Sequence, residues 1–167
     1  DLDGDGEKGP SEPSAVTDSD GNYSFESVDA MATIVATTTD ETVDKSSGEP
    51  LTNVVLKAPP GASVITPATT ILEATPDIQP EQLAAALGIP TTASDGSTID
   101  ITTFNPYAEN ADPAVALAAE KAAQSVMVTI KAVSAAAEGA GLSEDVAFEQ
   151  ALASVTEVVS EVAKTVT

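Results

Sequence analysis

The sequence DPAVALAAEKAAQSVMVTIKAVSAAAEG at residues 112–139 predicts one long helix. Asp112 is a favourable N-cap residue, Pro113 suits the first helical position, and Gly139 is a common residue at a helix end. Apolar side chains recur along one stripe of this helix, which we expect to be its packing face. The stripe contains Val115, Ala119, Ala122, Val126, Val133 and Ala137, with Leu117, Met127 and Ile130 beside it.

A second long helix is predicted after a short turn. Ser143 is its expected N-cap, and Glu144 and Asp145 place negative charge in the first turn, where the helix dipole favours it. The apolar residues of this helix are Val146, Leu152, Val155, Val159 and Val162. Because residues 139–141 form a short Gly-Ala-Gly link, we expect an antiparallel, alanine-rich helix hairpin whose role is packing.

Two shorter helices are predicted upstream of this pair. The first spans residues 66–74, with Thr66 as the N-cap and Pro67 at the first helical position. The second spans residues 80–87 and ends at Gly88, a residue that readily adopts the conformation required after a helix. From residue 66 onward the chain is therefore expected to be helical.

Residues 1–65 have a different composition, rich in Thr, Val, Asp, Gly and Pro, with short alternating apolar runs typical of β-strands. The expected strands are residues 22–25, 32–36 and 53–57, followed by a short extended segment at 63–65. The sequence thus predicts an α+β fold. Its parts are an antiparallel β-sandwich-like unit at 1–65 and an α-helical region at 66–167 that packs on it.

The charge of the chain excludes several classes of partner. It has 27 acidic residues against 6 basic ones, a formal net charge of -21. Nucleic-acid binding needs a basic face, so no nucleic acid is expected as a partner. No apolar run approaches the roughly 20 residues that span a bilayer, and no membrane insertion is expected. Divalent cations and basic partners are favoured.

The absence of His and Cys removes most catalytic chemistry. Without them the chain lacks the usual general base, a thiol nucleophile, disulfides and soft-metal ligands. No base is placed to activate Thr69 or Thr70, and we expect these hydroxyls to form hydrogen bonds where the β-region meets the first helix. We therefore expect no enzyme. Catalysis through metal-bound water ranks last, since calcium activates water poorly compared with zinc.

The opening sequence, DLDGDGEKGPSE at residues 1–12, has the spacing of a twelve-residue calcium loop. Carboxylates stand at positions 1, 3 and 5, glycine at 6, and a glutamate able to bind in bidentate fashion at 12. The alternative is a solvated acidic turn. The candidate Ca²⁺ ligands are Asp1, Asp3, Asp5, Glu12 and the backbone carbonyl of Glu7.

A second acidic segment, DSDGN at residues 18–22, leaves two interpretations open. Asp18 and Asp20 would either bind the same ion or a second one, or the segment is a β-turn with Asp and Gly in their usual places. The acidic residues at 40, 41, 44 and 49 are expected in a solvated loop without a site.

Several motifs together resemble a module of large bacterial surface proteins and adhesins. They are DLDGDG (1–6), EPSAVTDSDGNYSF (12–25), APPGASVITPATT (58–70), ALGIP (86–90) and ITTFNPYA (101–108). The first part resembles the calcium-stabilised, immunoglobulin-like B-type repeats of the Sdr adhesins. The later motifs resemble the helical extension that follows such a unit in long environmental surface proteins. The resemblance covers about residues 1–138 and implies a secreted structural or adhesive role, with calcium as a rigidifying ligand.

The chain departs from that pattern in two ways. Lys8 and Gly9 stand where relatives often carry an apolar residue and an aspartate, so water, Asp18 or Asp20 is expected to replace one ligand. In such modules an apolar strand also leads into the first aspartate, whereas this sequence begins there. We expect either an excerpt of a longer chain or a processed product, with an open sheet edge that a neighbouring subunit or domain fills with a strand.

The functional expectation is an extracellular structural or adhesive module of a bacterial cell-surface protein. It would be stiffened by Ca²⁺ and assembled with neighbouring subunits into a filament or sheath. The alternative is a module that binds a glycan or a surface partner, for which Tyr23 and Tyr107 are the obvious contact residues.

Overall fold

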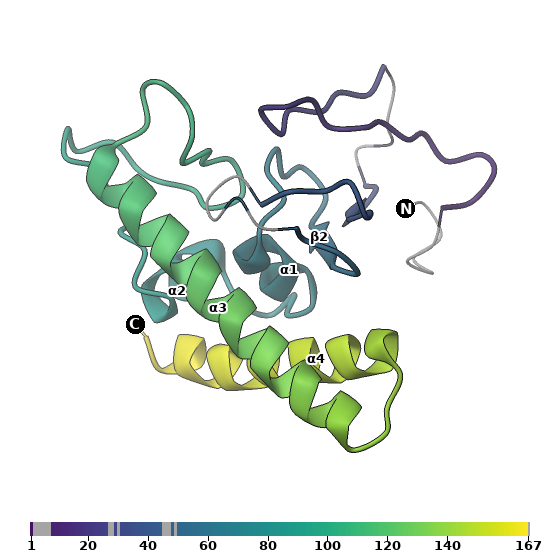
Figure 1. Cartoon of the computed structure of the whole chain (residues 1–167). Coiled ribbons are helices and arrows are strands. Elements are labelled where there is room, and N and C mark those ends of the chain that lie inside the picture. Colours follow the sequence, from purple (N-terminus) through teal and green to yellow (C-terminus); the bar gives the residue numbers. More distant parts are fainter. Residues whose placement is uncertain (2–7, 27–28, 30, 45–47, 49, 167) are drawn as a thin grey trace.

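The computed structural model describes residues 1, 8–26, 29, 31–44, 48 and 50–166. Its elements are strands β1 (Ile34–Thr37) and β2 (Val55–Ala58) and helices α1 (Pro67–Glu73), α2 (Pro80–Ala86), α3 (Pro113–Gly139) and α4 (Glu144–Thr165). Helix α3 lies across the middle of the molecule, with the strands and α1 on its upper side and α4 below it (Figure 1). None of the helices in the described part of the chain combines the length and apolar character needed to cross a bilayer.

Strands β1 and β2 pair antiparallel, from Ile34 opposite Ala58 to Thr37 opposite Val55. One further residue pair extends this ladder. The backbone N–H of Thr38 donates to the Val54 carbonyl at 3.0 Å, and the N–H of Val54 donates to Thr38 Oγ1 at 2.9 Å. A threonine side chain therefore takes the role of a backbone carbonyl at the end of the sheet.

The predicted β-sandwich is wrong. The strands expected at residues 32–36 and 53–57 are present as β1 and β2 with slightly shifted bounds, but residues 22–25 belong to no strand. Within the described residues the sheet has two strands only. The molecule is mostly helical, with a small sheet at one side.

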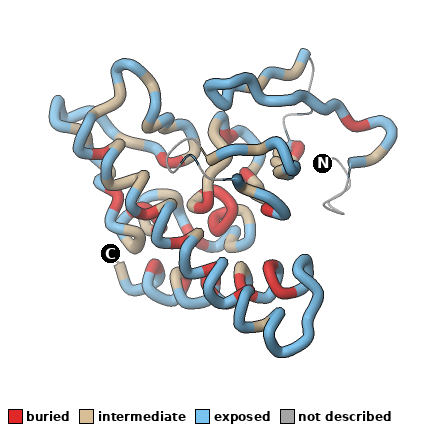
Figure 2. Tube along the Cα trace, in the orientation of Figure 1, coloured by how far each residue is buried: buried red, intermediate tan, exposed pale blue. Residues whose placement is uncertain are grey.

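The sandwich does not form because helix α1 packs against the sheet and residues 8–26 have little to bury. A two-stranded sheet needs either further strands or a helix against its face, and α1 meets that need. Residues 8–26 are mostly exposed (Figure 2). Their two aromatic side chains, Tyr23 and Phe25, contact each other edge to face, with ring centroids 5.8 Å apart.

Two buried threonines join β2 to α1, as predicted. Thr69 and Thr70 are 0% and 2% exposed. Thr70 Oγ1 accepts the backbone N–H of Lys57 at 2.9 Å and lies 2.9 Å from the Thr66 carbonyl, to which it donates. Thr69 Oγ1 accepts the N–H of Thr66 at 2.8 Å and lies 3.0 Å from the Lys57 carbonyl. The start of the helix is thereby fixed to one residue of the strand.

The predicted N-cap residues are confirmed for the first and third helices. Thr66 Oγ1 accepts the N–H of Thr69 at 3.1 Å at the start of α1. At the start of α3, Asp112 Oδ1 accepts the N–H groups of Ala114 and Val115 at 2.9 and 3.0 Å. Asp112 Oδ2 also accepts the N–H of Ser94 at 2.8 Å, and these hydrogen bonds, first those from Ser94, lower the pKa of Asp112 to about 2.

One hydrophobic core connects the strand region with all four helices. It runs from Val54 beside the sheet through Ile71 and Leu83 to Ile130 and Phe148 on the long helices. Figure 2 shows the buried residues gathered where α1, α3 and α4 face one another. The long helix pair predicted from the sequence is therefore present and forms the base of this core.

The faces of α3 and α4 match the predicted stripes only in part. The residues buried as expected include Val115, Ala122, Val126 and Val155. Leu117, Val133, Val146 and Val162 were expected to pack inward but are 55%, 39%, 41% and 46% exposed. Small or polar side chains occupy much of the buried face instead: Ser134 on α3, and Ala147, Ala151, Thr156, Ser160 and Ala163 on α4. Small side chains let helix backbones approach closely, so these positions are buried beside larger apolar residues such as Ile130 and Phe148.

Replacing Ile130 by alanine tests the position of the core. Ile130 is 0% exposed, so the Ile130→Ala change is expected to lower the free energy of unfolding by about 2 to 5 kcal/mol. Val128, on the same helix, is 67% exposed, and Val128→Ala should stay within about 0.5 kcal/mol of the parent. Urea unfolding followed by circular dichroism measures both. Equal losses for the two variants would contradict the described packing.

Replacing Thr70 by valine tests the junction between β2 and α1. Valine has nearly the same shape but leaves the Lys57 N–H without its acceptor, which should cost about 1 to 3 kcal/mol. The matched control is Thr129→Val on α3, where the exposed hydroxyl donates only to the Ser125 carbonyl. Similar urea midpoints for the two variants would contradict a stabilising role of the hydrogen bond between Thr70 and the Lys57 N–H.

Candidate functional site

The structure places the two ends of the predicted calcium loop beside each other. The protonated α-amino group of Asp1 forms an ion pair with Glu12 Oε1 at 3.9 Å and donates a hydrogen bond to the Thr33 carbonyl at 2.9 Å. The side chains of Asp1 and Glu12 are 3% and 6% exposed. Loop positions 1 and 12 thus meet at the beginning of the sheet, and both carboxylates lie away from solvent.

A tight turn holds the carboxylate of Glu12. Its Oε2 accepts the N–H of Gly9 at 2.7 Å, while its own N–H donates to the Gly9 carbonyl at 3.2 Å. Glutamate is rarely buried unless it is paired or binds a cation, because removing a carboxylate from water is costly. Glu12 is buried, and its carboxylate is stabilised there by the Gly9 N–H and by the α-amino group of Asp1.

Three of the predicted ligands, Asp3, Asp5 and Glu7, lie outside the described residues. Across the parts of the chain that the structure describes, no three acidic side chains come together as a metal-binding group. The described part of the loop offers two side chains shielded from solvent, Asp1 and Glu12, whose carboxylate oxygens are the ligand type that calcium prefers.

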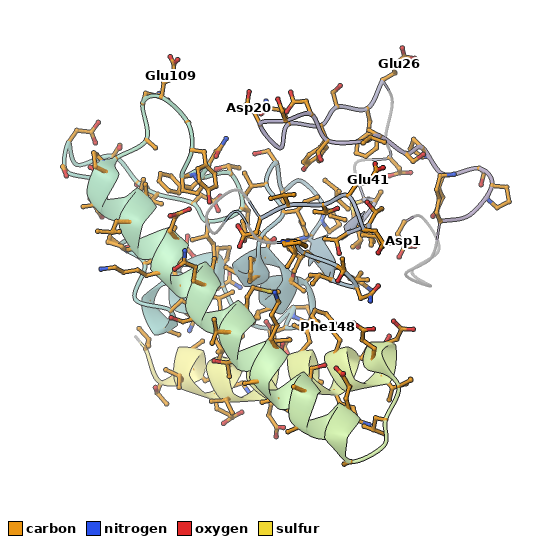
Figure 3. All side chains as sticks on the ribbon, viewed as in Figure 1. Asp1, Asp20, Glu26, Glu41, Glu109 and Phe148 are labelled. Carbon is orange, nitrogen blue, oxygen red and sulfur yellow. The ribbon has the colours of Figure 1, made fainter. Side chains whose placement is uncertain are left out.

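The second acidic segment forms a turn. Asp18 Oδ1 accepts the N–H groups of Asp20 and Asn22 at 2.8 and 2.9 Å, and Asn22 Nδ2 lies 3.1 Å from Asp18 Oδ2. Figure 3 shows Asp20 well separated from Asp1. The structure therefore does not bring Asp18 and Asp20 to the end of the loop marked by Asp1 and Glu12. Of the two interpretations of this segment, the hydrogen bonds favour the turn.

Sequence reasoning missed a cleft beside Tyr107. The cleft has a volume of about 580 Å³ and lies between α3, the beginning of α1, β2 and the connection that precedes α3. Its apolar lining includes Leu56, Ile101, Phe104 and Met127, and its polar lining includes Tyr107, Glu120, Asp44 and Lys131. The sequence did show aromatic residues in an otherwise polar connection, but not that α3 lies opposite them. A second apolar groove, of about 740 Å³, lies between α2, α3 and α4.

Tyr107 and Glu120 form the polar edge of this cleft. The Tyr107 hydroxyl donates to Glu120 Oε1, and the tyrosine side chain remains 53% exposed. Burial of the phenol, its hydrogen bond to Glu120 and the nearby charges of Glu120 and Asp44 raise the pKa of Tyr107 well above its ordinary value. Negative charge thus gathers where this aromatic ring meets the solvent.

No protein-family model matches the chain, and no curated protein or solved structure was found that is similar to it. The resemblance to calcium-binding surface modules stays a prediction made from the sequence.

The alkaline titration of Tyr107 tests the Tyr107–Glu120 pair. In a Tyr23→Phe variant, which leaves Tyr107 as the remaining tyrosine, the phenolate absorbance should appear at a pH clearly above 10. Because the pKa is raised by folding, stability should fall as the pH rises above about 10, where the unfolded tyrosine ionises first. Adding Glu120→Gln should move the midpoint down. A midpoint near 10 with either residue at position 120 would contradict the described contact.

Proposed function

We propose that this chain is a calcium-braced structural module of an extracellular bacterial surface protein. The observation that carries the proposal is the burial of Glu12 next to Asp1. These residues are the first and last positions of a loop whose sequence has calcium spacing. The α-amino group of Asp1 already supplies one positive charge to Glu12, and a divalent cation bound through the loop would supply more and would tie the N-terminal segment to the sheet.

The high negative charge supports the same proposal. A chain with a net charge of -21 repels itself, and bound cations relieve part of that repulsion. The absence of His and Cys from the sequence leaves carboxylates and carbonyls as the main metal ligands, and these suit calcium rather than zinc. The work assigned to the module is mechanical, and the proposal includes no reaction.

We propose that a neighbouring subunit or domain attaches at the outer edge of β1, the edge that faces away from β2. In the ladder with β2, Thr38 and Val54 form a hydrogen-bonded pair, so Val35 and Thr37 direct their backbone groups away from β2. Within the described residues no second strand covers this side of the sheet, and Asp1 donates to the adjacent Thr33 carbonyl. A strand from a neighbouring subunit or domain would extend the sheet here by pairing with β1.

A binding module is the second candidate, and the cleft beside Tyr107 is the observation that favours it. The mostly apolar lining of this cleft suits an apolar ligand better than a glycan, whose hydroxyl groups need polar partners.

Thermal unfolding in EDTA and in millimolar calcium tests the proposal. At a calcium concentration 100 times the dissociation constant, binding to the folded state should add about 2.7 kcal/mol of stability. Glu12→Gln should remove most of this calcium-dependent gain. Glu26→Gln changes the net charge equally at an exposed position and should retain it (Figure 3).

The comparison uses the calcium-induced shift of each variant, so a lower starting stability of Glu12→Gln does not confuse the result. If calcium did not raise the unfolding temperature of the parent chain, or raised that of both variants equally, the loop would be an acidic turn without a calcium site. Sedimentation of the same samples tests assembly separately. A monomer at all concentrations, with and without calcium, would contradict strand addition at β1.

A further inference from the structure

We propose that the cleft beside Tyr107 binds an amphiphile that has an apolar chain and an ammonium headgroup. The inference is independent of the calcium proposal, because the cleft is built from the strand-to-helix region, the connection before α3 and α3 itself. Its basis is the combination of an apolar interior with an aromatic ring and two carboxylates at its polar lining.

The interior of the cleft fits a hydrocarbon chain. Its volume of about 580 Å³ lies within the range of roughly 300 to 1,000 Å³ that is usual for small-molecule sites. Leu56 from β2, Ile101 and Phe104 from the connection and Met127 from α3 contribute apolar surface. Leu56, Phe104 and Met127 are only partly buried, so a chain placed here would remove more of their surface from water. The thioether of Met127 adapts readily to ligands of different shape.

The polar lining fits a cation. Glu120 and Asp44 supply two carboxylates, and Tyr107 supplies an aromatic ring that is 53% exposed. An ammonium group beside a tyrosine ring is attracted by the negative face of the ring, and quaternary ammonium ligands are commonly recognised in this way. Among the described lining residues Lys131 is the basic one, so the two carboxylates leave a net negative charge among these groups. An anionic headgroup would meet both this local charge and the net charge of -21.

The lining of the groove between α2, α3 and α4 does not favour one kind of ligand headgroup over another. It is larger, at about 740 Å³, but its lining consists of small and apolar residues with Lys121 as the charged group. Of these two hollows, the cleft beside Tyr107 is the one whose described lining favours a particular ligand headgroup.

Calorimetric titration with decyltrimethylammonium below its micelle concentration tests the proposal. Decyl maltoside and decyl sulfate serve as neutral and anionic probes with the same chain. We expect one saturable site for the ammonium compound, with about tenfold or greater preference over the neutral probe, and still weaker binding of the sulfate. Equal affinity for the three headgroups, or no binding of the ammonium compound, would overturn the proposal.

Matched variants separate the headgroup site from the general negative charge. Glu120→Gln should weaken binding of the ammonium probe about tenfold, whereas Glu149→Gln, an equal charge change at an exposed position of α4, should not. Tyr107→Phe retains the ring and should retain binding, whereas Tyr107→Leu should weaken it. The same loss for Glu120→Gln and Glu149→Gln would show non-specific attraction and would contradict the site.

Filling the cleft provides a test that does not depend on charge. Ala123 lies on the α3 face that lines the cleft, and Ala123→Leu should abolish binding by occupying its volume. The control is Ala136→Leu, on an exposed position of the same helix, which should bind as the parent does. Both variants retain good helix formers, and circular dichroism verifies their folding. Unchanged binding by a folded Ala123→Leu variant would place the ligand elsewhere and overturn the proposal.

Discussion

The structure depends on the attachment of α1 to one residue of β2. Lys57 has its backbone N–H bonded to Thr70 and its carbonyl next to the hydroxyls of Thr69 and Thr70, all within buried surroundings. Two strands alone would be marginal in water, so the sheet needs this helix against it. The helix in turn carries Ile71 into the core that α3 and α4 complete. The strand-to-helix junction therefore couples the N-terminal part of the chain to the helical part.

The helical half was predictable because its signals are local. Thr66 and Asp112 act as N-caps, and Gly88, with a φ of 73°, follows the end of α2 in the left-handed region that glycine adopts easily. The packing faces were not predictable to the same degree. Ser134, Thr156 and Ser160 are buried while Val133 and Val162 are not, because close helix contact selects for small size as well as for apolar character.

The candidate sites also differ in how far the sequence predicted them. The calcium spacing of residues 1–12 is written in the sequence, and the structure brings its end positions, Asp1 and Glu12, together. For residues 18–22 the sequence left an ion site and a β-turn open as interpretations, and the hydrogen bonds of Asp18 favour the turn. The sequence pointed to Tyr107 as a possible contact residue but not to the cleft beside it, since the walls of the cleft come from segments far apart in the chain.

The sequence by itself determined the helices, the N-caps at Thr66 and Asp112, the positions of both strands and the strong negative charge, since each depends on neighbouring residues or on composition. Tertiary structure decided that two strands pair with a helix at their face instead of with a second sheet, because that choice depends on which apolar surface is available to cover them. It also decided which sides of α3 and α4 are buried and where Tyr107 meets Glu120. These features depend on how close the elements lie to one another in space. The residue pattern of a single helix or strand does not specify that spacing.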